Sequence, residues 1–185
     1  MKKVILLAVA AFAGLTAFAQ PKFAHVNFTE LIQLMPEADQ ARTTMTASSK
    51  EAQDTYRAMV DEFQTKYSTY QQNAGTWTQV IRETKEKELT DIQQRIQEFS
   101  QSVEQELAQQ QQQLFAPIQQ KAIETVNTLA KEGGYVYVFD KTSVLYIDEA
   151  QSADLTPAAR KALGIADDRT LESLQQELAA QQQAQ

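Results

Sequence analysis

The chain has 185 residues, 24 acidic and 17 basic, with a formal net charge of −7 and no cysteine. The lack of cysteine excludes a disulfide framework and a thiolate metal site. The acidic balance disfavours indiscriminate binding to nucleic acid, so we expect no nucleic-acid partner. A single histidine, His25, excludes a site with two histidine ligands, and no glycine-rich phosphate loop occurs. The sequence therefore predicts no enzyme, no cofactor and no metal.

Residues 1–19 have the pattern of a secretory signal peptide. A basic start, Met1-Lys2-Lys3, precedes an apolar stretch over residues 4–15 and the small-residue cleavage site Ala17-Phe18-Ala19. The apolar stretch is shorter than the roughly 20 residues that span a bilayer, although an uncleaved anchor is the alternative. Cleavage after Ala19 leaves 15 basic residues against 24 acidic ones, a net charge of −9. We predict export to the periplasm.

The mature chain is expected to begin with a short strand and a short helix. The segment 22–28 has the partial alternation of a strand. Thr29 is the predicted N-cap of a helix from Glu30 to Met35, which Pro36 ends. His25 lies within the strand, between two apolar residues, and we interpret it as a structural residue.

A run of 80 residues, from Glu37 to Ala116, contains no proline and only one glycine, Gly75. We predict two long helices that form an antiparallel coiled-coil hairpin, the arm, with its turn at Asn73 to Thr76. Folding the chain at Ala74 would place the start of the first helix beside the residues just before Pro117, with Glu37 near Gln112. Large apolar residues recur in steps of three, four and seven, as in a heptad seam. The seam residues are Met45, Ala52, Tyr56, Met59, Phe63, Tyr67, Tyr70, Trp77, Ile81, Leu89, Ile92, Ile96, Phe99, Val103, Leu107 and Leu114.

After the arm, the sequence predicts a kink, a glycine stop and a β-hairpin. Pro117 lacks an N–H group and should kink the helix, which then continues to Gly133-Gly134 as its C-cap. Two β-rich runs follow, Tyr135 to Phe139 and Val144 to Ile147. The short polar connection between them predicts that they pair as a hairpin.

The last part of the chain is predicted to be helical. Thr156 is the expected cap, and Pro157 the first residue, of a helix that ends at Gly164. A further helix is predicted over residues 168–180, before a glutamine-rich tail. No role is assigned to residues 164–185.

These elements predict an α+β fold that is mostly helical, with a long coiled-coil arm projecting from a small β-rich body. The body comprises residues 20–36 and 117–163, the arm residues 37–116, and the C-terminal extension residues 164–185. Two or three short strands do not form an independently stable sheet. We therefore expect several copies to share the body, and a two-helix arm of low stability to bend.

The arm tip is aromatic and locally basic in an otherwise acidic protein. No acidic residue occurs between Glu62 and Glu83. Tyrosine and tryptophan favour half-wet surfaces, so this tip suits contact with unfolded chains or lipid headgroups. The candidate contact residues are Phe63, Lys66, Tyr67, Tyr70, Trp77, Arg82, Lys85 and Lys87.

The alternative for the tip is that its aromatic residues only hold the hairpin together. The seam spacing favours this interpretation for Phe63, Tyr67 and Tyr70. Trp77, beside the turn, is expected to be exposed. Lys85 occupies a seam position, where a charge weakens packing, and both interpretations stay open.

The order of these parts resembles the Skp/OmpH family of periplasmic chaperones over residues 22–163. The resemblance is carried by Val26-Asn27, Met35-Pro36-Glu37, Ala116-Pro117-Ile118, Gly134-Tyr135 leading into residues 136–140, Val144-Leu145-Tyr146 and Asp154-Leu155-Thr156. It implies a homotrimer whose arms enclose unfolded outer-membrane β-barrel proteins, their clients, without ATP. Some members bind lipopolysaccharide and anionic membranes. The body residues that the resemblance implies are Phe23, Val26, Val136, Val138, Val144, Leu145 and Ile147.

The charge of the arm departs from this family, whose well-studied members are strongly basic. From Glu37 to Lys131 the chain has 14 acidic and 10 basic residues. Attraction to lipopolysaccharide is therefore expected only near Lys66, Arg82, Lys85 and Lys87.

Two other functions compete with a chaperone. One is a structural coiled-coil adaptor that docks to an envelope complex through the arm tip. The other is binding to a lipid surface through the same tip.

Overall fold

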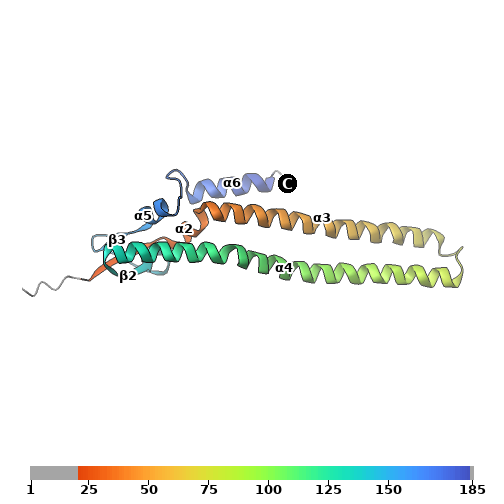
Figure 1. Cartoon of the computed structure of the whole chain (residues 1–185). Coiled ribbons are helices and arrows are strands. Elements are labelled where there is room, and N and C mark those ends of the chain that lie inside the picture. The colour runs from red at the N-terminus through yellow and green to blue at the C-terminus, as the bar shows by residue number, and fades with distance from the viewer. Residues whose placement is uncertain (1–20, 184–185) are drawn as a thin grey trace, which may run out of the picture.

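The computed structural model describes residues 21–183 as a small body with one long helical hairpin projecting from it (Figure 1). The hairpin consists of α3 (Pro36–Asn73) and α4 (Gln79–Gly133). The body contains a three-stranded sheet and the helices α2 (Phe28–Leu34) and α5 (Thr156–Ala162). A last helix, α6 (Leu171–Gln183), lies along α3 on the side away from α4 (Figure 1). This arrangement confirms the predicted fold class; the predicted signal peptide lies outside the described residues.

The sheet is parallel, with β1 (Lys22–Val26) between β2 (Tyr135–Asp140) and β3 (Ser152–Asp154). Ala24 pairs with Val138 on one side and with Ala153 on the other. The predicted first strand is thus confirmed as the central one. Its residues Ala24, His25 and Val26 are almost fully buried, so both faces of the strand are covered here, because successive side chains point to opposite faces.

The predicted β-hairpin is wrong. After β2, the Asp140 carboxylate accepts hydrogen bonds from the Thr142 N–H (3.2 Å) and hydroxyl (2.7 Å), which stabilises a 3-10 turn over Lys141–Ser143. Val144 is extended, but it belongs to no strand, and the second partner of β1 is instead β3. A β-rich sequence becomes a strand only where it meets the hydrogen-bonding groups of a neighbour. Residues 144–147 do not pair with the open edge of β2; Val144 and Ile147 instead line a hollow with Phe23 and His25 of the sheet.

The body helices pack into one apolar core beneath the sheet. Asn27, rather than Thr29, caps α2, since its side chain accepts a hydrogen bond from the Glu30 N–H at 3.1 Å. Gly164, with φ of 71°, follows α5 as predicted. The core residues are Val26, Leu31, Leu34, Met35, Ala38, Ala41, Ile118, Ala122, Val126, Ala159, Leu163, Ile165 and Leu174.

The ends of the arm helices follow from local chemistry. Met35 has extended backbone angles, and Pro36 begins α3, where a missing N–H costs no helical hydrogen bond. Thr78 caps α4 by accepting from the Ile81 N–H at 3.5 Å. Gly134 ends α4 in the left-handed region, at φ of 68°. Pro117 lies inside α4, which continues through it as helix.

The chain reverses over residues 74–78, so the partners across the hairpin differ from the expected ones. Tyr70 donates a hydrogen bond to Glu86, and Lys121 donates to Glu37. The expected neighbour of Glu37 was Gln112, which is wrong because the connecting loop extends to Thr78. The first helix therefore reaches past Pro117 and begins inside the body.

Candidate functional site

The described residues 21–183 contain neither a cluster of metal-ligating side chains nor a helix long and apolar enough to cross a membrane. One polar group in the sheet was not foreseen: His25 Nδ1 lies 2.9 Å from the Ser152 hydroxyl, and its Nε2 lies 3.9 Å from Asp154 Oδ2. That second distance is too long for a hydrogen bond. The other oxygen of Asp154 accepts from the Thr156 N–H at 2.8 Å. These contacts join β1 to β3 and begin α5, which is a structural role.

The aromatic residues of the arm tip pack in pairs. Phe63 and Tyr67 stack along α3, with ring centroids 5.8 Å apart. Tyr70 meets Trp77 edge to face at 6.0 Å, so Trp77 closes the loop rather than standing free. Trp77 and Tyr70 are half-buried, while Tyr67 is exposed. The tip therefore combines hairpin closure with aromatic surface.

The basic residues near the tip are largely paired with acids. Glu88 lies 3.0 Å from Lys85 and 3.5 Å from Lys66, and hydrogen bonding to Lys85 lowers the pKa of Glu88. Lys87 pairs with Asp91 at 2.8 Å. Arg82 has no carboxylate partner within the described part of the chain. Pairing lowers the net positive field of the tip, and Lys85 keeps its seam position because Glu88 neutralises it.

The middle of the arm has open grooves where its two helices meet. Two hollows of about 250 and 580 Å³ lie between α3 and α4, and they share Ala52, Phe99, Val103 and Leu107 in their walls. The small Ala52 faces these larger side chains without filling the space between the helices. Within the described arm beyond Ala41, only Ile92 is buried, and the other seam residues are half-buried or exposed. The arm thus carries apolar surface that it does not cover itself.

The sheet also leaves apolar surface uncovered. Phe23 stacks on Tyr137, and Tyr137 contacts Phe139, yet all three rings are exposed. Val136 is 56% exposed, and Leu145, in the unpaired segment after β2, is fully exposed. Of the residues assigned to the oligomer body, Val138, Val144 and Ile147 are half-buried. Val26 is buried in the core of this same chain, so it supports the body from within.

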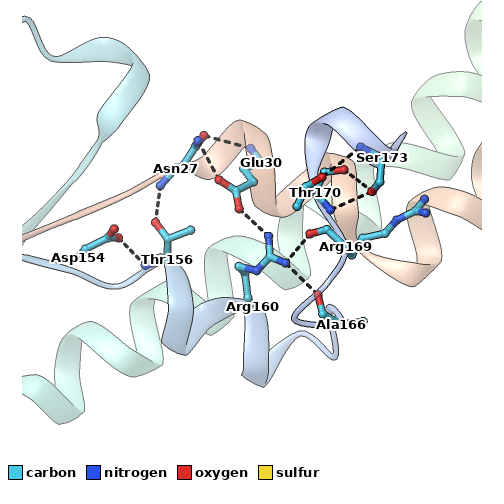
Figure 2. A network of polar contacts seen from close by, with 9 residues as sticks. All are labelled: Asn27, Glu30, Asp154, Thr156, Arg160, Ala166, Arg169, Thr170 and Ser173. Atoms are coloured by element: carbon cyan, nitrogen blue, oxygen red, sulfur yellow. Dashed lines mark hydrogen bonds and ion pairs between the residues drawn. The ribbon is translucent and has the colours of Figure 1, made fainter. Parts of the chain in front are cut away.

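A polar network that the sequence analysis missed joins the sheet to the C-terminal extension (Figure 2). Arg160 donates to Glu30 Oε1 at 2.6 Å and to the carbonyl oxygens of Ala166 and Arg169 at 2.8 and 2.5 Å. The Asn27 N–H donates to the Thr156 hydroxyl at 2.9 Å. The only signal in the sequence was a lone arginine in a short helix, with its partner 130 residues away.

The chain is similar to known proteins in family and in fold. Residues 22–163 match the model of the family described as outer membrane protein (OmpH-like). Among curated proteins, none matches the sequence. A crystal structure of a candidate outer membrane chaperone (OmpH-like) from Caulobacter crescentus CB15 is similar, with a TM-score of 0.70 over 82% of this chain and 92% of that chain. Its identity is 13%, so this likeness concerns the fold. Because the family model covers most of its length, the chain belongs to the OmpH-like family.

Proposed function

We propose that this protein is an ATP-independent holdase chaperone of the periplasm. In this proposal several arms enclose an unfolded outer-membrane β-barrel protein and keep it from aggregating. Membership of the OmpH-like family supports a chaperone role. The more specific proposal, that the arms hold unfolded outer-membrane proteins, depends on the surface of the arm.

The observation that carries the proposal is the half-covered apolar seam of the arm. The seam residues Tyr56, Tyr67 and Ile81 are each more than 40% exposed, and Val80, next to the seam, is 72% exposed. Such residues offer many weak apolar contacts and no shaped pocket, so binding would require no particular client sequence. An unfolded chain has apolar surface to bury in return.

Self-association is part of the proposal, with a homotrimer as the form that the family resemblance implies. The exposed rings of Phe23 on β1 and of Tyr137 and Phe139 on the edge strand β2 form an apolar surface, and the exposed Leu145 follows β2 in the chain. The open edge of β2 and the unpaired segment after it offer hydrogen-bonding groups to another chain. Covering both with copies of the same chain would assemble the arms around one space.

Contact of the tip with lipid headgroups or lipopolysaccharide would be weak. Lys66, Lys85 and Lys87 are already paired with acids, which leaves Arg82 and the edge of Trp77 as candidates. Binding to anionic vesicles that is lost on Arg82→Gln, while client protection is kept, would make this a separate activity.

The test is suppression of aggregation of an unfolded outer-membrane β-barrel protein. The apolar variant replaces Tyr56, Tyr67, Val80 and Ile81 with serine. The matched control makes the same change to serine at four exposed residues of the same helices, Gln64, Gln71, Gln79 and Gln97. We expect the wild type and the control to suppress aggregation at a stoichiometric trimer concentration, and the apolar variant to lose most of this effect. No suppression by the wild type would contradict the proposal.

Capture from an envelope extract separates the holdase from an adaptor. Many unrelated outer-membrane precursors are expected with the arm as bait. One stoichiometric partner, retained by the apolar variant, would instead identify a structural adaptor.

A further inference from the structure

The C-terminal extension, residues 164–185, lies outside the match to the family model and yet contributes to the core of the body. Ile165 and Leu174 are 4% and 5% exposed. Leu171 and Leu178 are half-buried against the same cluster, which contains Leu31 of α2. The three leucines recur at steps of three and four, so one face of α6 is apolar. The extension is therefore packed into the folded body through this stripe.

An arginine connects the extension to the first turns of the arm. Arg169 Nη2 lies 2.8 Å from Asp39 Oδ1 on α3, and Nη1 lies 2.5 Å from Glu177 Oε1 on α6. The Arg169 side chain is 19% exposed, whereas Asp39 and Glu177 are 45% and 52% exposed, so water still screens these pairs in part. One side chain thus holds the beginning of α3 and the middle of α6 together.

The start of α6 is ordered by its own contacts and by α5. Thr170 and Ser173 cap each other: the Thr170 N–H donates to the Ser173 hydroxyl at 3.0 Å, and the Ser173 N–H donates to Thr170 Oγ1 at 3.1 Å. Arg160 binds the carbonyl oxygen of Arg169 while it pairs with Glu30 of α2 (Figure 2). Polar contacts therefore connect the sheet to the extension without a break, in addition to the apolar contacts of the core.

We infer that the C-terminal extension is a clasp that holds the root of α3 against the body and so sets the direction in which the arm leaves it. Ala38 and Ala41 at this root are buried in the cluster that includes Leu174, whereas α3 has no buried residue further out. A short helix beside one member of a hairpin restrains that member where it is attached. Bending of the arm is thereby confined to the part beyond the clasp.

Spin labels measure this restraint directly, because the chain has no cysteine of its own. Glu51→Cys on α3 and Lys161→Cys on α5, both exposed, report the angle between arm and body when labelled chains are diluted with unlabelled ones. We expect one narrow distance distribution in the full chain. A chain ending at Ala166, which keeps Ile165 in the core, should give a broader distribution.

Point variants keep the test valid if the shortened chain fails to fold. Leu174→Ala and Arg169→Gln should raise the amide exchange rate of residues 37–45 by about tenfold or more, the factor given by about 1.4 kcal/mol of lost packing. Glu172→Gln and Gln175→Ala, exposed on the same helix, are the matched controls and should leave it unchanged. An unaltered distance distribution and unaltered exchange in a folded Leu174→Ala chain would overturn the inference.

Discussion

The root and the outer part of the arm are built from similar residues but are packed differently. At the root, α3 lies between α4 and α6, and Ala38 and Ala41 are buried. Further out, α3 and α4 have only each other, and hollows remain around Ala52. Two helices alone cannot enclose a full core, so the outer arm keeps apolar surface that the root has lost. This difference separates a part that is anchored from a part that is free to bind and bend.

The largest expected effect comes from truncating the same side chain in the two regions. Leu34 is 2% exposed in the body core, and Leu107 is half-buried in the arm. Leu34→Ala should lower the free energy of unfolding by about 2–5 kcal/mol through lost burial and a cavity, whereas Leu107→Ala should cost less than about 1.5 kcal/mol. Urea unfolding at one fixed protein concentration measures both. Equal losses would show that the arm is packed as firmly as the body.

The next comparison uses two ion pairs. Arg160 and Glu30 are 13% and 22% exposed in the body, while Arg95 and Glu62 are 53% and 42% exposed across the arm. Arg160→Gln leaves a shielded carboxylate and two carbonyl oxygens without their donor, and we expect a loss of about 1–3 kcal/mol. Arg95→Gln should change the free energy of unfolding by less than about 1 kcal/mol. A large effect of Arg95→Gln would mean that the arm depends on cross-helix charge pairs.

Two glycines beyond the two ends of α4 give a smaller contrast. Gly134 has φ of 68°, a conformation in which a Cβ atom clashes, so Gly134→Ala should cost about 1–2 kcal/mol. Gly75 at the tip has no positive φ, and a Cβ atom placed on it would meet nothing within 4 Å. Gly75→Ala should therefore leave the unfolding free energy unchanged or raise it by up to about 1 kcal/mol. Thermal unfolding of both variants measures the difference.

The tip turn shows what the sequence could and could not predict. A long stretch without proline and with heptad spacing was enough to predict the hairpin, because both signals are local. The loop ends at Thr78 because the side chain of this residue caps α4, and the sequence analysis ended the turn at Thr76 instead. This small error in the length of the loop shifted every expected contact between the two arm helices. The parallel pairing of β1 with β3 was out of reach, since Ser152–Asp154 is too short for a periodic signal and its partner lies far away in the chain.

Among the candidate sites, the sequence pointed to surfaces rather than to a catalytic centre, and these sites stay predictions. It overestimated the positive charge of the tip because Glu88 and Asp91 lie outside the acid-free window yet within reach of the lysines. It also assigned no role to the extension. Three leucines in a glutamine-rich tail do not reveal which groove they occupy, and that information exists only in the folded body.

The smallest expected effect is the pH dependence of the pair that joins the two arm helices at their root. The hydrogen bond from Lys121 lowers the pKa of Glu37 below the usual 4.5. A carboxyl whose pKa is lower in the folded state stabilises that state fully above pH 4.5, and this contribution is lost as the pH falls through the folded pKa. The Glu37→Gln variant should therefore have a lower free energy of unfolding than the wild type at pH 6. On acidification, its free energy of unfolding should fall less than that of the wild type.

The control for this prediction is Glu88→Gln in the outer arm. Hydrogen bonding to Lys85 lowers the pKa of Glu88 as well, so the sign of the effect is the same, and the two pairs are similarly open to solvent. Salt should therefore weaken both of them. Urea midpoints at pH 6 and pH 4, each in low and high salt, separate the two. We expect acid to weaken both contributions in low salt and high salt to reduce both, because the side chains of the two pairs are similarly exposed. A Glu37 contribution that persists in high salt at pH 6, while that of Glu88 disappears, would show that the root is held together more firmly than the outer arm.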